Sequence, residues 1–102
     1  MLPCLTKFTQ DFIFSIGGVN KDSVHIYRIL ENSWVRAPTL KLARYNASSC
    51  ELGPKVYVFG GLTQHGSMVF SAIEMIDAAT VVKGIRAGVK WPEWERLDLP
   101  AH

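Results

Sequence analysis

The chain alternates between short hydrophobic runs and short polar turns, a pattern typical of an antiparallel β-sheet. Two runs, Phe12 to Ile16 and Lys55 to Phe59, are rich in aromatic and β-branched residues, and a turn signal precedes each. Residues 23–28 and 72–77 alternate apolar and polar positions, which is the period of a half-buried strand. Shorter candidate strands lie at residues 5–9, 34–36, 48–52 and 94–97. The pattern therefore predicts eight short strands.

Helical periodicity is weak throughout the chain. We expect at most one helical turn between Ala78 and Gly88, and no strand within residues 83–90. This stretch contains Lys83, Arg86 and Lys90, with no acidic residue between Ala78 and Pro92. Such a basic run favours a solvated loop, and the alternative is a contact with an acidic partner.

An internal repeat underlies the strand pattern. Gly17-Gly18 and Gly60-Gly61 lie 43 residues apart, and each pair follows one of the two strongest β-runs. Paired glycines at the end of a central strand indicate a sharp backbone turn and the close approach of another segment, where a Cβ atom would collide or would require a positive φ.

The first copy resembles the kelch repeat, whose hallmarks are a double glycine, a following tyrosine and a tryptophan seven positions later. Gly17, Gly18, Tyr27 and Trp34 match this pattern in full. The two aromatic rings offer broad surfaces for contact between neighbouring repeats, and each has a polar group that can reach a backbone partner.

The second copy resembles the same repeat with longer connections. Gly60, Gly61 and Trp94 match the motif, whereas Ile76 stands in the place of the tyrosine. The isoleucine keeps apolar bulk and lacks the hydroxyl, a change that the fold should tolerate. Arg44 also fits, because an arginine is often found just before the first strand of this repeat.

The resemblance implies an all-β fold made of two four-stranded antiparallel blades of an incomplete β-propeller. The expected blades are residues 1–40 and 41–102, with insertions at 62–71 and 78–92 in the second. Stacking on neighbours buries the core of such repeats, so two blades should leave two apolar faces bare. Further blades, or self-association of about two or three chains, would complete a ring.

The most buried residues are expected to come from the central strands and from the two motif tryptophans. They are Ile13, Ile16, Trp34, Val56, Tyr57, Val58, Phe59 and Trp94.

Composition narrows the possible roles of the chain. The 102 residues carry 11 basic and 9 acidic side chains, a net charge of +2 that does not favour nucleic acid. No apolar run approaches the length of a membrane span, and the N-terminus does not resemble a signal peptide. We therefore expect a cytoplasmic protein with Cys4 and Cys50 reduced, in which the sequon at Asn46 stays unused.

The sequence offers no recognisable catalytic or metal-binding constellation. His25, His65 and His102 share no ligand spacing with one another or with the cysteines, so we expect no metal, cofactor or catalytic residue. Cys50 lies in a β-run, which favours a small core residue over a nucleophile.

The resemblance implies that partner-binding residues lie in loops at one edge of the blades. Here those loops are residues 19–22, 39–46 and 62–71. The candidates within them are Arg44, Asn46, His65, Met68 and Phe70. Met68 and Phe70 offer an apolar contact, although Phe70 is equally suited to cover a blade edge. For Arg44, which points toward the central channel in similar proteins, a structural salt bridge is the alternative.

The function implied by the resemblance is a non-catalytic protein-interaction module of scaffold or adaptor type, with a protein partner. The alternatives are a part of a kelch-propeller enzyme similar to galactose oxidase, which requires a Tyr/His copper site, and a truncated remnant without function.

Overall fold

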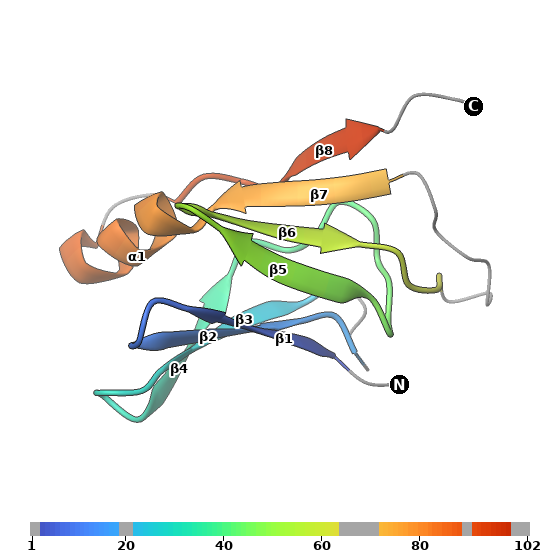
Figure 1. The fold of residues 1–102 in the computed structure, drawn as a ribbon. Helices are drawn as coiled ribbons and strands as arrows, with labels where there is room; N and C mark the ends of the chain where they lie inside the picture. Colours follow the sequence, from blue (N-terminus) through green and yellow to red (C-terminus); the bar gives the residue numbers. More distant parts are fainter. Residues whose placement is uncertain (1–2, 19–21, 64–71, 89–90, 99–102) are drawn as a thin grey trace.

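The structure, a computed structural model, describes residues 3–18, 22–63, 72–88 and 91–98. It contains two four-stranded antiparallel sheets and one helix (Figure 1). In the first sheet the strands follow the chain order: β1 (Cys4–Phe8), β2 (Phe12–Ile16), β3 (Val24–Arg28) and β4 (Ser33–Ala37). The second sheet repeats this order with β5 (Ser48–Leu52), β6 (Lys55–Phe59), β7 (Ala72–Asp77) and β8 (Glu95–Asp98). The prediction of eight strands is confirmed. Most of the shorter strands begin or end one residue away from the predicted bounds.

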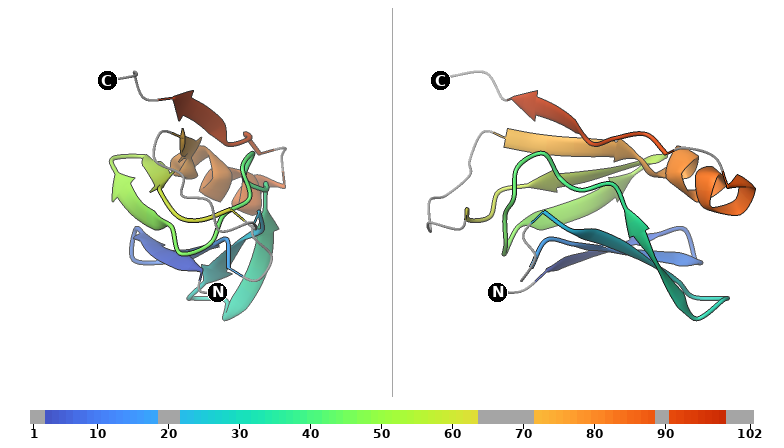
Figure 2. Two further views of the ribbon diagram at one scale, coloured as in Figure 1. Left: turned by 90° about the vertical axis from the view of Figure 1, so that its right-hand side faces the viewer. Right: turned by 180° about the vertical axis from the view of Figure 1, so that it is seen from behind.

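The two sheets diverge from a common edge. β1 and β5 lie side by side, whereas β4 and β8 are far apart, so the pair opens like a wedge (Figure 2). Thr6 on β1 and Ser49 on β5 are joined by a hydrogen bond between their hydroxyls. The backbone N–H of Thr9 also donates to the Glu51 carboxylate at 3.2 Å.

Each sheet has one covered face, and the two covered faces meet in a single hydrophobic core. Alternation along the strands puts Phe14, Ile16 and Ile26 of the first sheet and Val56 and Val58 of the second sheet into this core. The predicted burial of Ile16, Val56, Val58 and Trp94 is confirmed.

The other core predictions were wrong in one shared respect. Ile13, Trp34, Tyr57 and Phe59 lie on the faces of the sheets that point away from the core. Ile13 and Tyr57 are half-buried, whereas Phe59 and Trp34 are 40% and 59% exposed. The sequence pattern shows which residues share a face of a strand but does not show which face another sheet covers.

Helix α1 (Ala78–Ala87) is longer than the single turn expected from the sequence. Asp77 caps its first turn, because its carboxylate accepts the Thr80 N–H at 3.1 Å, and Gly88 ends it in the left-handed conformation at φ 69°. Val81 and Val82 are buried against the core at the end of the wedge. Burial of these two valines in the core stabilises the helix, and this outweighs the low helix propensity of β-branched residues.

The basic run is helical for the residues that the structure describes. Lys83 and Arg86 lie on α1, and Lys90 falls outside the described residues. Arg86 lies over the Phe12 ring at 5.5 Å and is 3.9 Å from the Asp11 carboxylate, so the helix also contacts the first sheet. The expectation of a loop was therefore wrong for this part, whereas the expected exposure of Lys83 and Arg86 to solvent is confirmed.

Candidate functional site

The candidate site lies at the ends of the strands, where the loops after β2, β4 and β6 begin. We call this side of the two blades the loop edge. In an antiparallel meander these three connections leave the same edge, and the opposite edge carries the short turns and α1 (Figure 1). Loops placed on a rigid sheet are the usual position for binding residues. Within the described residues this edge consists of 17–18, 22–23, 38–47 and 60–63.

The paired glycines allow the chain to cross itself at this edge. Gly18 has φ +94° and Gly61 has φ +91°, a backbone conformation that residues with a side chain rarely adopt. A Cβ on Gly61 would lie 2.8 Å from the Tyr45 carbonyl oxygen and 3.0 Å from the Ala47 Cβ. A Cβ on Gly18 would lie 3.1 Å from the Pro3 nitrogen, so both glycines make room for the segment that leads into the first strand of their own blade. The predicted reason for the glycines is confirmed.

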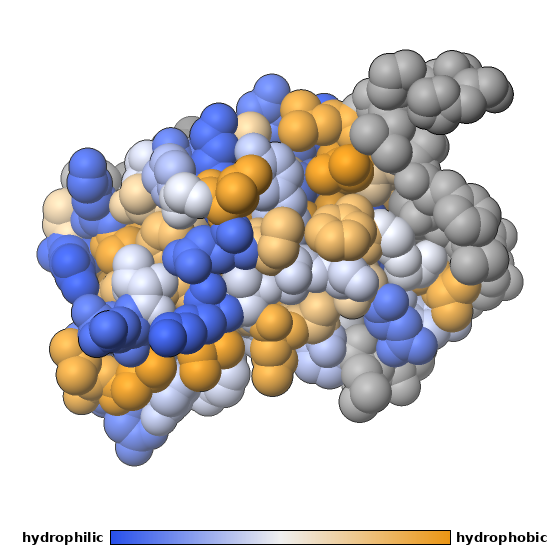
Figure 3. Space-filling model, viewed as in Figure 1, coloured by the Kyte–Doolittle hydropathy of each residue, from blue (hydrophilic) through white to orange (hydrophobic). Residues whose placement is uncertain are grey.

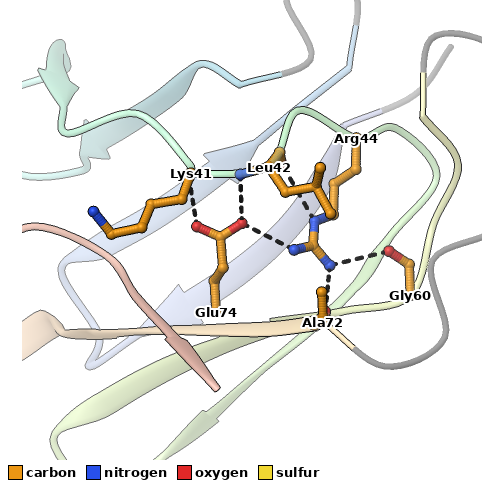
Figure 4. A network of polar contacts seen from close by, with 6 residues as sticks. All are labelled: Lys41, Leu42, Arg44, Gly60, Ala72 and Glu74. Atoms are coloured by element: carbon orange, nitrogen blue, oxygen red, sulfur yellow. Dashed lines mark hydrogen bonds and ion pairs between the residues drawn. The ribbon is translucent and has the colours of Figure 1, made fainter. Parts of the chain in front are cut away.

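The segment between the blades is anchored by a buried ion pair. The Arg44 guanidinium and the Glu74 carboxylate are 2.9 Å apart, and both side chains are fully buried (Figure 4). Glu74 also accepts the backbone N–H groups of Lys41 at 2.5 Å and Leu42 at 3.0 Å. The carboxylate on β7 thereby holds three residues of the connection from β4 to β5: Lys41, Leu42 and Arg44.

Arg44 uses its other N–H groups on backbone carbonyls, one of them the Leu42 carbonyl of its own connection at 3.4 Å. Its guanidinium donates to the carbonyl oxygens of Ala72 at 2.9 Å and Gly60 at 3.2 Å (Figure 4). Because every charged group here has a partner, the pair avoids the large cost of an isolated buried charge. Arg44 has no exposed surface to offer a partner, and the structural salt bridge considered from the sequence is present.

Two further hydrogen bonds hold the same connection. The Trp94 indole N–H donates to the Pro38 carbonyl at 2.9 Å, and the Leu40 N–H donates to the Asp22 carbonyl at 2.8 Å. The motif tryptophan of the second repeat therefore joins β8 to the connection between the blades. Glu74 was not among the predicted site residues. A signal was available, because Glu74 shares a face of its strand with the apolar residues Ala72 and Ile76.

The other predicted partner-binding residues are placed unevenly. Asn46 is exposed at this edge and has a positive φ of 54°. His65, Met68 and Phe70 fall outside the described residues. Arg44 and Asn46 lie on the same connection, with Arg44 buried beneath it.

The cysteines differ in their surroundings. Burial raises the pKa of the Cys4 thiol above its ordinary value of 9.0. Cys50 is exposed on the outer side of β5, which makes the interpretation of Cys50 as a core residue wrong; neither cysteine forms a disulfide. Among residues 3–18, 22–63, 72–88 and 91–98 no group of three His, Cys, Asp or Glu side chains is placed to hold a metal ion. The one helix of this part of the chain is too short to cross a membrane.

No protein-family model matches the chain. A curated relative does: an F-box/kelch-repeat protein of Arabidopsis thaliana is 40% identical to it over 58 residues. The match covers 57% of this chain and 15% of that protein, so the chain spans a small part of the relative's length. The motif residues, the two four-stranded meanders and this similarity over part of the chain are consistent with two kelch blades.

Proposed function

We propose that the chain acts as a non-catalytic protein-interaction module. The partner binds at the loop edge, which carries the loops after β2, β4 and β6. The observation that carries this proposal is the buried Arg44–Glu74 network, which fixes the connection between the blades at that edge. A connection held in one conformation loses less conformational entropy on binding than a mobile one. Lys41 and Asn46 on this connection are exposed.

The edge suits a polar or mixed protein surface. Its described exposed residues include Asp22, Thr39, Lys41 and Asn46, which offer both charges and both hydrogen-bonding capacities. Similarity to kelch repeats does not by itself determine a scaffold role, because one fold supports many functions. The cytoplasmic location expected from the sequence belongs to this proposal.

The test compares two asparagines that share a backbone conformation. Asn46 and Asn32 are both exposed with φ near +50°, at opposite edges of the blades. Proteins cross-linked to the immobilised chain in cell extract are quantified for the wild type, Asn46→Lys and Asn32→Lys. A specific partner should be depleted by Asn46→Lys and retained by Asn32→Lys. Equal retention or equal loss in the two variants contradicts binding at the loop edge.

A further inference from the structure

The two sheets each expose a second, outer face with apolar character. The first outer face consists of Leu5, Lys7, Ile13, Ser15, His25, Tyr27, Trp34 and Arg36. The second outer face consists of Ser48, Cys50, Leu52, Lys55, Tyr57, Phe59, Ile73, Met75, Asp77, Glu95 and Leu97. Figure 3 shows apolar side chains gathered over β6, β7 and β8. Leu5 and Leu52 are 65% and 67% exposed, which makes both faces candidates for contact with another protein.

The repeat itself indicates what covers the first outer face. With the glycine pairs and strand registers superposed, Ile13, Tyr27 and Trp34 occupy the positions of Val56, Ile76 and Trp94 in the second blade. Those three counterparts are all buried in the core between the two sheets. The same surface therefore serves as an inter-sheet interface in the second blade and is open in the first.

The second outer face is the counterpart of the surface that does the covering. Tyr57 and Phe59 occupy the positions of Phe14 and Ile16, and Met75 occupies the position of Ile26. Phe14, Ile16 and Ile26 form the centre of the core between the sheets. The molecule thus carries both halves of one type of interface, on opposite sides.

Charge favours contact between these two outer faces. The first carries two basic side chains, Lys7 and Arg36, and no acidic one, whereas the second carries Lys55 against Asp77 and Glu95. Within the described part of the chain neither Lys7 nor Arg36 forms an ion pair. Such complementarity steers association and selects its orientation.

We propose that the chain associates head to tail with a second copy, the second outer face of one molecule packing on the first outer face of the next. The contact repeats the packing already present between the two sheets, so each addition applies a similar rotation. A heterologous interface of this kind closes into a ring when the rotation divides a full turn. Rings of about four to eight blades correspond to about two to four copies. The proposal rests on sheet packing and is independent of the loop-edge partner.

The experiment blocks one face at a time. Trp34→Asp blocks the first outer face and Phe59→Asp the second, while Leu30→Asp changes a 75% exposed leucine in the β3–β4 turn and serves as the control. Molar mass is measured by light scattering over a wide range of concentrations. We expect the wild type and Leu30→Asp to form discrete oligomers and each face variant to lose about tenfold or more in association constant.

Mixing distinguishes head-to-tail contact from a symmetric one. Trp34→Asp keeps the second outer face and Phe59→Asp keeps the first, so an equimolar mixture should form a one-to-one dimer and stop there. Circular dichroism verifies folding, and Leu5→Asp with Leu52→Asp forms a second pair of variants on the same two faces.

Three outcomes would overturn the proposal. A wild type that stays monomeric over the whole concentration range would show that a second copy does not cover these faces. Oligomers that persist in one face variant alone would indicate a symmetric interface. A mixture that stays monomeric would show that the two faces do not fit each other.

Discussion

Trp34 and Trp94 occupy the same position of the two repeats in opposite surroundings. Trp94 is 1% exposed and its indole N–H is bonded to Pro38, whereas Trp34 is 59% exposed and contacts Tyr27 at 5.0 Å between ring centroids. The difference comes from the surroundings, because Trp94 belongs to the core between the sheets whereas Trp34 lies on the outer face of the first sheet. A motif position therefore does not by itself determine burial.

These surroundings predict different effects of the same substitution. Trp94→Ala should lower the free energy of unfolding by about 3–5 kcal/mol, since it empties a packed site and leaves the Pro38 carbonyl without its donor. Trp34→Ala should cost about 1 kcal/mol or less. Urea unfolding at low protein concentration measures both, and equal losses would contradict the bare first outer face.

The second glycine of each motif pair is the other residue for which the structure gives a sharp expectation. Gly61→Ala combines a φ of +91° with a backbone oxygen 2.8 Å from the new Cβ, so it should destabilise the protein by about 2 kcal/mol or more. Gly53→Ala is the matched control, because its φ is +59° and its Cβ would meet nothing within 4 Å. Its cost should be nearer 1 kcal/mol in the same unfolding experiment. A Gly53→Ala loss equal to that of Gly61→Ala would show that the close contact contributes nothing.

At the scale of elements, the strands could be predicted and the helix could not. β2, β5, β6 and β7 have the predicted bounds, because alternation and turn residues are local signals. The stripe of Ala78, Val81, Val82 and Ile85 is helical in spacing, but its β-branched residues concealed it. Its stabilising contacts lie in distant parts of the chain, in the core between the sheets.

The same reason limited the prediction of the candidate site. The motif predicted Arg44 and the loop edge. The partner of Arg44 is Glu74, which lies 30 positions later in the chain and belongs to no local pattern around Arg44. Which face of each sheet is covered depends on packing between sheets, so Trp34 and Phe59 were assigned to the core. Local pattern predicts elements and their faces, and long-range packing decides burial.

Helix α1 should depend on its cap. Asp77→Ala removes the acceptor for the Thr80 N–H and should cost about 1 kcal/mol, whereas Asp77→Asn keeps an acceptor and should cost little. Thermal unfolding followed by circular dichroism compares the two. A loss as large in Asp77→Asn as in Asp77→Ala would mean that the charge, rather than the cap, matters.

The connection between the blades should depend on the intact ion pair. Glu74→Gln or Arg44→Met alone leaves a buried charge without its partner, so each should cost about 3–5 kcal/mol. The double variant should lose less unfolding free energy than the sum of the two single losses, because the residues are in direct contact.

The exposed pair of Arg86 and Asp11 provides the comparison for this prediction. Their side chains are 64% and 37% exposed, and Arg86→Met should change stability by about 1 kcal/mol or less. Additive losses at Arg44 and Glu74 in urea unfolding would contradict the coupling.

At the scale of the whole molecule, the two sheets form a wedge held at three places. The β1–β5 contact lies at its narrow edge, the anchored connection crosses one end, and α1 fills the other. This arrangement fixes the angle between the sheets using contacts within one chain. It also leaves the two outer faces in a constant relation, which a closed assembly requires.

The exposed indole of Trp34 gives the protein an optical signal of its own. An indole in water emits at longer wavelength than one in apolar surroundings and is reached more easily by iodide. Trp34 lies in the proposed contact, whereas Trp94 is buried in the monomer and Trp91 is half-buried. Emission should therefore shift to shorter wavelength and resist quenching as concentration rises, and Trp34→Phe should abolish most of that change. The spectrum of the unlabelled chain would then record whether its outer faces are covered.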